Sequence, residues 1–302
     1  MNGALTVSAL AALTGAFFFA LAAALQQREA LSVAADGVAD VRLLWRLAHR
    51  PLWLIGILAD VLAAVLHAVA LGFGSIALVQ PLGVTGLLFA IPLVAMLRRQ
   101  RIPPRDLAAA AVVLAGLVGV LRVFPATTDS AVAGPGGITA LVGVTLGVGV
   151  ICIGLAALVP GRPRALLLAG AAGIAFGVTA VLVRATLQLT GRPHATSAPV
   201  LAVVGVLLLI GGGYLCLQNA YRAGHFAGSL AMAVVIDPIA AILGGLNLLG
   251  EPGPRPGQSV IIVLSAVAII GGIALLVASP ANLLALPPSD DAKEPGQHDA
   301  VA

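Results

Sequence analysis

Charged residues are scarce in this chain of 302 residues, of which Asp, Glu, Lys and Arg make up only 9%. Soluble domains carry about 25% charged residues, so the composition excludes a water-soluble globular protein. The two cysteines, Cys152 and Cys216, both fall in apolar segments and are expected to be small core residues. Hydrophobic residues are abundant, at 60%, and the mean hydropathy is +1.09. The sequence therefore predicts an all-α, polytopic membrane protein, with the lipid bilayer as its first partner.

Sequence motifs of catalysis are also missing. We find no phosphate-binding loop, metal-ligand cluster or serine nucleophile motif, and no second motif-borne aspartate of the kind that an intramembrane protease needs. We expect a protein that is not an enzyme and that has no cofactor and no metal site. The net charge of +4 would favour nucleic acid in a soluble protein. Here the arginines lie between apolar runs, so no nucleic-acid partner is expected.

Nine apolar segments are each long enough for a hydrocarbon core of about 30 Å. No Lys or Arg precedes the first, so it is expected to be a retained helix rather than a signal peptide. The predicted spans are 4–26, 52–72, 75–97, 106–124, 136–158, 165–189, 199–221, 227–249 and 257–279. Loops on one side carry eleven arginines and those on the other carry three, with a lysine in the tail. The positive-inside rule then places the N-terminus outside and the C-terminus in the cytoplasm of a cell membrane.

The order of features in the first four spans recurs in the last four. The first span (TGAFFFALAAALQQ) is similar to the sixth (GIAFGVTAVLVRATLQ), and the third and eighth share Gly-Ser followed by a polar residue before proline. Equivalent spans are five apart, so they would cross in opposite directions, as in many secondary transporters. We expect two inverted four-helix repeats, at 1–124 and 161–279, around an unpaired fifth helix within 125–160. A basic helix is expected within 27–51, and the tail at 280–302 is expected to be disordered.

Asp237-Pro238 lies near the middle of the eighth span, and Gln80-Pro81 occupies the matching place in the third. A carboxylate at mid-membrane depth costs roughly 2.5–3.5 kcal/mol and is seldom left without a partner or a task. A proline in a helix frees a carbonyl that a solute or proton could use. We therefore take Asp237 and Gln80 as candidate substrate or coupling residues, with Pro81 and Pro238 shaping the helices.

The other polar side chains within spans leave two interpretations each. Asp60 and His67 lie seven residues apart on one face, so they could form a proton relay or make interhelical hydrogen bonds. Arg184 could clamp an anionic group or neutralise Asp237, and we favour neutralisation. Asn219 and the glutamines near span ends are expected to snorkel or to hydrogen-bond between helices. Asn219, at the entry to the eighth span, is also taken as a candidate substrate or coupling residue. Glycine clusters are expected to allow close helix packing; they comprise Gly143, Gly147, Gly170, Gly173, Gly177 and Gly211 to Gly213.

Two stretches resemble a known family. GSIALVQPL followed by LLFAIPLVAMLRRQRIPPRDLAAAAVVLAGLVGV, and LQNAYRAGHFAGSLAMAVVIDPIAAILGGLNLLGEPGPRPG, look like the paired helix segments of EamA-like drug/metabolite transporters. ALGFGSIALVQPLG also resembles the NIPA-like magnesium transporters, a nine-helix branch of that superfamily. The resemblance implies alternating access around a site between two halves. Magnesium relatives carry an acidic residue about one turn beyond Asp60, where this chain has Ala64.

The function predicted from the sequence is a secondary transporter that moves a small polar solute, with proton coupling as a hypothesis. A divalent-cation carrier of the NIPA-like type and a non-transporting membrane scaffold are the alternatives. A second copy of the chain, in a homodimer, is a further candidate partner.

Overall fold

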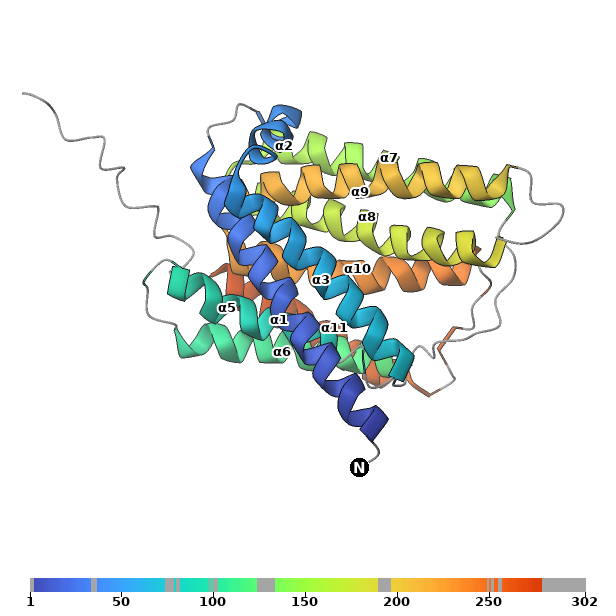
Figure 1. The fold of residues 1–302 in the computed structure, drawn as a ribbon, viewed down its shortest axis with the longest axis horizontal. Coiled ribbons are helices and arrows are strands. Elements are labelled where there is room, and N and C mark those ends of the chain that lie inside the picture. Colours follow the sequence, from blue (N-terminus) through green and yellow to red (C-terminus); the bar gives the residue numbers. More distant parts are fainter. Residues whose placement is uncertain are drawn as a thin grey trace, which may run out of the picture.

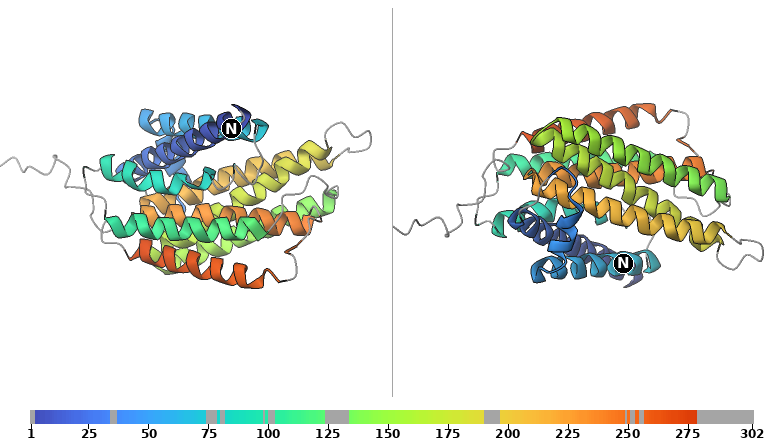
Figure 2. Two further views of the ribbon diagram at one scale, coloured as in Figure 1. Left: turned by 90° about the horizontal axis from the view of Figure 1, so that it is seen from below. Right: turned by 90° about the horizontal axis from the view of Figure 1, so that it is seen from above.

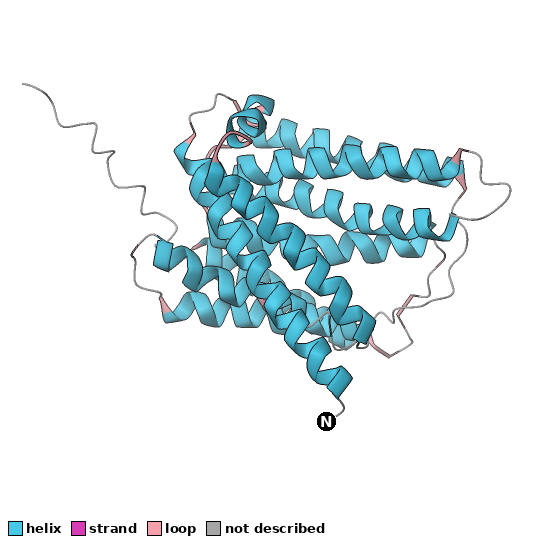
Figure 3. Cartoon of the chain, in the orientation of Figure 1, coloured by secondary structure: helices cyan, strands magenta, loops and turns pink. Residues whose placement is uncertain are grey.

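The computed structural model describes residues 3–33, 37–73, 79, 82–97, 99, 103–123, 134–189, 197–248, 250, 253–254 and 257–278. Helices are the only regular secondary structure within these ranges (Figure 3). The all-α prediction is therefore confirmed for the described part of the chain. Gln80, Pro81 and the tail from residue 280 onward lie outside the described residues.

The helices begin and end within a few residues of most predicted spans. They are α1 (Gly3–Ser32), α2 (Val41–Leu47), α3 (Pro51–Phe73), α5 (Gly86–Leu97), α6 (Pro104–Val123), α7 (Pro135–Leu158), α8 (Arg162–Leu189), α9 (Ala198–Arg222), α10 (Phe226–Leu248) and α11 (Ser259–Val277). The short basic helix expected before the second span is α2, and the Asp40 carboxylate caps it by accepting from the Arg42 N–H at 2.9 Å.

Eight of the described helices are long and apolar enough to cross a membrane, namely all except α2 and α5. This supports an integral membrane protein. In the third predicted span, the described residues form a shorter apolar helix over Leu82–Leu97, whereas a bilayer core needs about 20 residues. The count of nine spans therefore stays a prediction.

Two groups of helices pack together (Figures 1 and 2). In one, α1 packs against α3 and α5. In the other, α8 packs against α7, α9 and α10, and these four run nearly parallel in Figure 1. The groups meet where α1 contacts α9 and where α5 contacts α10. The remaining pair, α6 and α11, pack on each other, and α6 contacts both α5 and α10.

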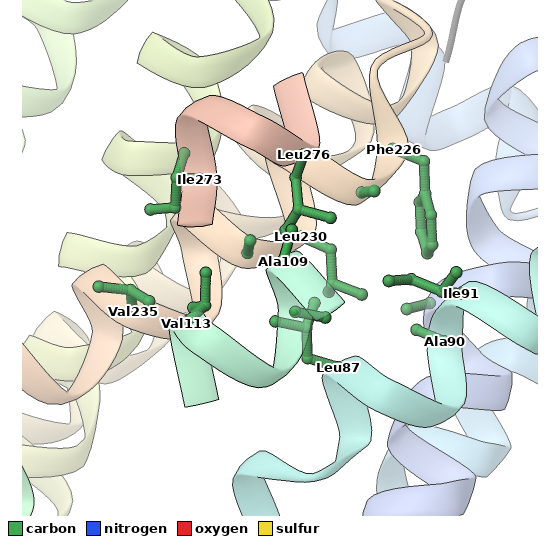
Figure 4. Packing of buried hydrophobic residues seen from close by; sticks show 14 of the residues in the cluster. Leu87, Ala90, Ile91, Ala109, Val113, Phe226, Leu230, Val235, Ile273 and Leu276 are labelled. Carbon is green, nitrogen blue, oxygen red and sulfur yellow. The ribbon is translucent and has the colours of Figure 1, made fainter. Parts of the chain in front are cut away.

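The largest apolar core lies where α5, α6, α10 and α11 converge beside α1 (Figure 4). Leu87, Val113 and Leu230 are fully or almost fully buried in it. Its small members, such as Ala90 and Ala109, let the backbones approach closely, as helices in lipid require.

Glycines are close-packing residues in only part of the bundle. A Cβ at Gly173 would lie 2.7 Å from the Ala233 carbonyl oxygen, so α8 and α10 touch backbone to backbone. By contrast, a Cβ at Gly143 or Gly147 on α7 would have no neighbouring atom within 4 Å among the described residues. The prediction of close packing is therefore correct for Gly173 and Gly177 on α8 and wrong for the cluster on α7, which directs most of its surface away from the other described helices. On α9 it is correct for Gly213, which meets the Phe176 ring, and wrong for Gly211 and Gly212.

Candidate functional site

Gln218, Gln26, Asp60 and Tyr214 form a series of hydrogen-bonded side chains, the amide chain. It crosses the place where α1, α3 and α9 meet, the Asp60 junction. The Gln26 Nε2–H of α1 donates to Asp60 Oδ2 of α3 at 2.6 Å, and the Tyr214 hydroxyl of α9 donates to the same oxygen at 2.8 Å. The Gln218 Nε2–H of α9 donates to Gln26 Oε1 at 2.7 Å. Each glutamine thus donates its hydrogen bond in the direction of the Asp60 carboxylate. Two donors on one carboxylate oxygen stabilise a negative charge where water is scarce.

Helix length positions these side chains inside the bundle. α1 does not end at residue 26 but continues to Ser32 through Ala-Leu-Gln-Gln-Arg-Glu-Ala-Leu, a run of good helix formers. Gln26 is consequently 1% exposed and Gln218 is fully buried. The glutamines therefore make interhelical hydrogen bonds, and they do not snorkel.

One buried polar atom of this junction, Gln218 Oε1, has no partner among the described residues. Nε2 of Gln27, the residue after Gln26 in the sequence, is also buried without a described partner. An unsatisfied buried polar group costs about 1–3 kcal/mol, so such atoms in native proteins usually meet water or a ligand. The Gln218 oxygen can accept a hydrogen bond from a small polar molecule.

Asn219 belongs to a neighbouring set of contacts that ties the start of α2 to the end of α9. Its Oδ1 accepts from the Asp40 backbone N–H at 3.3 Å, and its Nδ2–H donates to the Leu215 carbonyl at 2.8 Å. The Arg222 guanidinium donates to the Gly37 carbonyl. The structure thus gives Asn219 a bracing contact and places it one residue from the amide chain.

Asp237 lies in the middle of α10 against α8, in surroundings unlike those of Asp60. A Cβ at Gly177 would overlap the Asp237 carbonyl oxygen, and one at Gly173 would lie 3.2 Å from the Asp237 nitrogen. No hydrogen bond or ion pair of the Asp237 carboxyl occurs among the described residues. Pro238 follows it within a helix that runs unbroken from Phe226 to Leu248, so the Val234 carbonyl cannot receive the usual helical hydrogen bond.

The favoured pairing of Arg184 with Asp237 is wrong for the described contacts. Arg184 lies seven residues beyond Gly177 on α8, which places it about 10 Å farther along the helix axis. The half-buried Arg184 makes a polar contact elsewhere.

The described residues show no contact that would join Asp60 and His67 in a proton relay. Two helical turns separate them on α3. The Asp60 carboxylate contacts Gln26 and Tyr214, whereas the His67 ring lies 3.7 Å from the place a Cβ would take at Gly83. Of the two interpretations, the structure therefore favours interhelical hydrogen bonds of Asp60.

Sequence reasoning did not single out Tyr214, Gln26 or Gln218 as site residues. One signal could have found Tyr214. When Gly74-Ser75 is superposed on Gly228-Ser229 in the sequence, Asp60 falls opposite Tyr214, 154 residues later.

Comparison with known proteins gives one informative relative. No protein-family model and no solved structure matches the chain. "Uncharacterized protein Cgl0250/cg0304" of Corynebacterium glutamicum is 30% identical over 251 residues, which cover 81% of this chain and 85% of the relative. The name of that relative assigns no activity. Similarity of this extent over most of both chains shows common membership, and the chain belongs to the same family as this Corynebacterium glutamicum protein.

Proposed function

We propose that the protein is a secondary transporter that moves a small polar solute by alternating access, with the Asp60 junction as its solute site. The observation that carries the proposal is the buried amide chain, whose Gln218 Oε1 has no partner among the described residues. A static scaffold gains nothing from such atoms, because they cost stability when unpaired. A solute site needs them.

Helix contacts support the proposed inverted repeat. Within the first half α1 contacts α3 and α5, and α5 contacts α6; within the second half α8 contacts α9 and α10, and α10 contacts α11. These pairs correspond when α1 is matched with α8, α3 with α9, α5 with α10 and α6 with α11. α7 then has no counterpart, as the unpaired fifth helix requires. Solute sites of inverted-repeat carriers lie between the halves, and the amide chain joins α1 and α3 to α9.

The resemblance to EamA-like transporters and the loop charges give the remaining parts of the proposal. Asp237 would act as a second participant, coupling transport to a proton. The excess of arginine on one side would place the N-terminus outside and the C-terminus in the cytoplasm of the cell membrane.

Thiol labelling tests whether the amide chain ever meets water. In a background with Cys152→Ser and Cys216→Ala, Gln218→Cys is exposed to a membrane-impermeant thiol reagent in right-side-out and in inverted vesicles. Alternating access predicts modification from at least one face. Ala220→Cys, on the same helix but in an apolar cluster, is the matched control and should stay unmodified. If Gln218→Cys reacts from neither face, the junction is dry and a scaffold role replaces the transporter.

Transport itself is tested by uptake of a panel of polar solutes into proteoliposomes. Asp60→Asn keeps an acceptor for Gln26 and Tyr214 but removes the charge, and we expect it to abolish uptake of any solute that the wild type carries. Unchanged uptake by Asp237→Asn would exclude proton coupling through that residue.

A magnesium carrier is the second candidate, and one observation favours it. Both described hydrogen bonds of Asp60 reach Oδ2, so Oδ1 has no described partner and could face a hydrated cation. The described residues hold no cluster of three or more His, Cys, Asp or Glu side chains, so the site would be weak and largely hydrated. Calorimetry with Mg²⁺ should show binding that Asp60→Ala removes; heats that are equal in both proteins would exclude it.

A further inference from the structure

A basic hollow opens between the end of α1 and the end of α2, just before α3 begins. Its volume is about 480 Å³, and it is lined by Ser32, Val33, Trp45, Arg46, His49 and Arg50. The proposed transport mechanism does not use these side chains. The residues that line it include two arginines, a histidine, a serine and a tryptophan, and arginine is the residue best suited to bind a phosphate group.

The hollow is a built feature of the fold. Leu43 and Leu47 on the inner face of α2 are fully buried against Val33 and Trp53, which fixes α2 across the end of α1. The His49 Nδ1–H donates to the Trp45 carbonyl at 2.8 Å, and the two rings meet edge to face at 4.8 Å. Trp45 and His49 therefore hold one wall in place.

Arg50 is only partly neutralised. Its one described side-chain contact is with Glu29, at 4.0 Å, the outer limit of an ion pair, and its side chain is 47% exposed. A guanidinium has five N–H donors, so most of those on Arg50 remain available. An anion that enters the hollow can accept them.

Exposed apolar side chains continue from the hollow along α3. Leu54 and Leu58 follow Arg50 at intervals of four residues, so they share its helix face. They are 49% and 67% exposed, and Val61 and Val65 extend the strip at 55% and 53%. Trp45, 73% exposed, marks the depth at which aromatic rings lie in the interface. A phosphate group at Arg50 would thus be continuous with a surface for acyl chains.

We propose that this hollow binds the headgroup of an anionic phospholipid, with the acyl chains lying along the exposed face of α3. The phosphate contacts Arg46 and Arg50, and Trp45 lies against the glycerol region. Contacts of Asp40 and Arg222 also tie the segment just before α2 to α9. The lipid therefore braces the region beside the amide chain.

Tryptophan fluorescence gives a direct test. The chain has two tryptophans, so Trp53→Phe leaves Trp45 as the single reporter. The protein is reconstituted in phosphatidylcholine vesicles with a minor fraction of phosphatidylglycerol, and bromine is placed on the acyl chains of one lipid or the other. We expect brominated phosphatidylglycerol to quench Trp45 well beyond its share of the lipid. Quenching in proportion to that share would overturn the proposal.

Charge variants identify the site. Arg46→Gln and Arg50→Gln should each lower the preference for phosphatidylglycerol about fivefold, since one cation near an anionic surface contributes about that factor. Arg42→Gln removes the same charge from the same helix without lining the hollow, so it should have a much smaller effect. An equal loss in Arg42→Gln would show surface charge alone and overturn the site.

Three further measurements distinguish a phospholipid site from a site for free anions. Arg46→Lys should keep most of the preference for phosphatidylglycerol, and Glu29→Gln should raise that preference by freeing Arg50.

Inorganic phosphate should leave the quenching ratio unchanged. Full displacement by phosphate would show a site for free anions and overturn the lipid assignment. Thiol labelling of Gln218→Cys is independent of lipid preference, so either proposal can fail without the other.

Discussion

Asp60 and Asp237 are both carboxyl groups within membrane-spanning helices, but their surroundings differ. Asp60 accepts two hydrogen bonds, from α1 and α9, so it links three helices through side chains. Asp237 lies where α8 and α10 touch through backbone and glycine, and its carboxyl has no described partner. One junction is held by polar side chains and the other by close packing.

This difference separates structural from functional reasons for a buried acid. The two hydrogen bonds of Asp60 offset its burial, so the functional case at that junction depends on the unpartnered Gln218 oxygen. Asp237 adds an insertion cost with no described bond to offset it. Residues that break a local rule without a structural gain are commonly functional. A mutation series on the two junctions can therefore sharpen the contrast or remove it.

The largest effect should come from the packed junction. Gly177→Leu would place a side chain on the Asp237 backbone, and we expect about 3 kcal/mol of destabilisation, since the contacting atoms are backbone and cannot move aside. Thermal unfolding in detergent measures it. Gly147→Leu on α7, where a Cβ meets open space, is the matched control and should be tolerated. Equal losses at both positions would show that the α8–α10 contact is not special.

Removing each carboxyl should have opposite consequences for stability. Asp60→Ala leaves the Gln26 amide and the Tyr214 hydroxyl without their acceptor, which we expect to cost about 2 kcal/mol. Asp237→Ala breaks no described hydrogen bond and should leave the protein unchanged or more stable by about 1 kcal/mol. Unfolding in a denaturing detergent compares the two. If Asp237→Ala is the more damaging change, Asp237 has a structural partner and the comparison fails.

The two junctions also show which features of the structure could be predicted from the sequence. Helix positions follow from apolar length, so α8, α9 and α10 lie within a few residues of the predicted spans. The end of α1 could not be predicted, because Gln26, Gln27 and Glu29 look like interface residues until α3 and α9 are packed around them. Side-chain pairing between helices depends on their rotation and depth. Asp60 was therefore a correct candidate for interhelical bonding, whereas its donor Tyr214 was missed.

A smaller effect is expected at the edge of the polar junction. Tyr214→Phe removes one of the two donors to Asp60 while keeping the ring contact with Phe176, whose centroid lies 5.5 Å away. We expect a loss of about 1 kcal/mol, roughly half that of Asp60→Ala. A double-mutant cycle with Asp60→Ala checks it: the two losses should be strongly non-additive. Additive losses would mean that the hydroxyl stabilises something other than Asp60.

The smallest expected effect lies in the turn that connects the two junctions, between α9 and α10. Burial of the His225 ring, together with the positive charge of Arg162, lowers its pKa below 6.5, against the contrary effect of its hydrogen bond to the Ala223 carbonyl. The unfolded chain then binds more protons than the folded one as the pH falls through 6.5, so stability decreases until the pH lies below the folded pKa. His225→Gln should remove this decrease, which we expect to be about 0.5 kcal/mol or less because the ring is partly exposed. Unfolding at about pH 7.5 and at about pH 5.5, on either side of the ordinary histidine pKa, measures it. A wild type and variant with the same pH dependence would show that protonation of this turn does not affect how α9 and α10, and with them the two carboxyl groups, are held together.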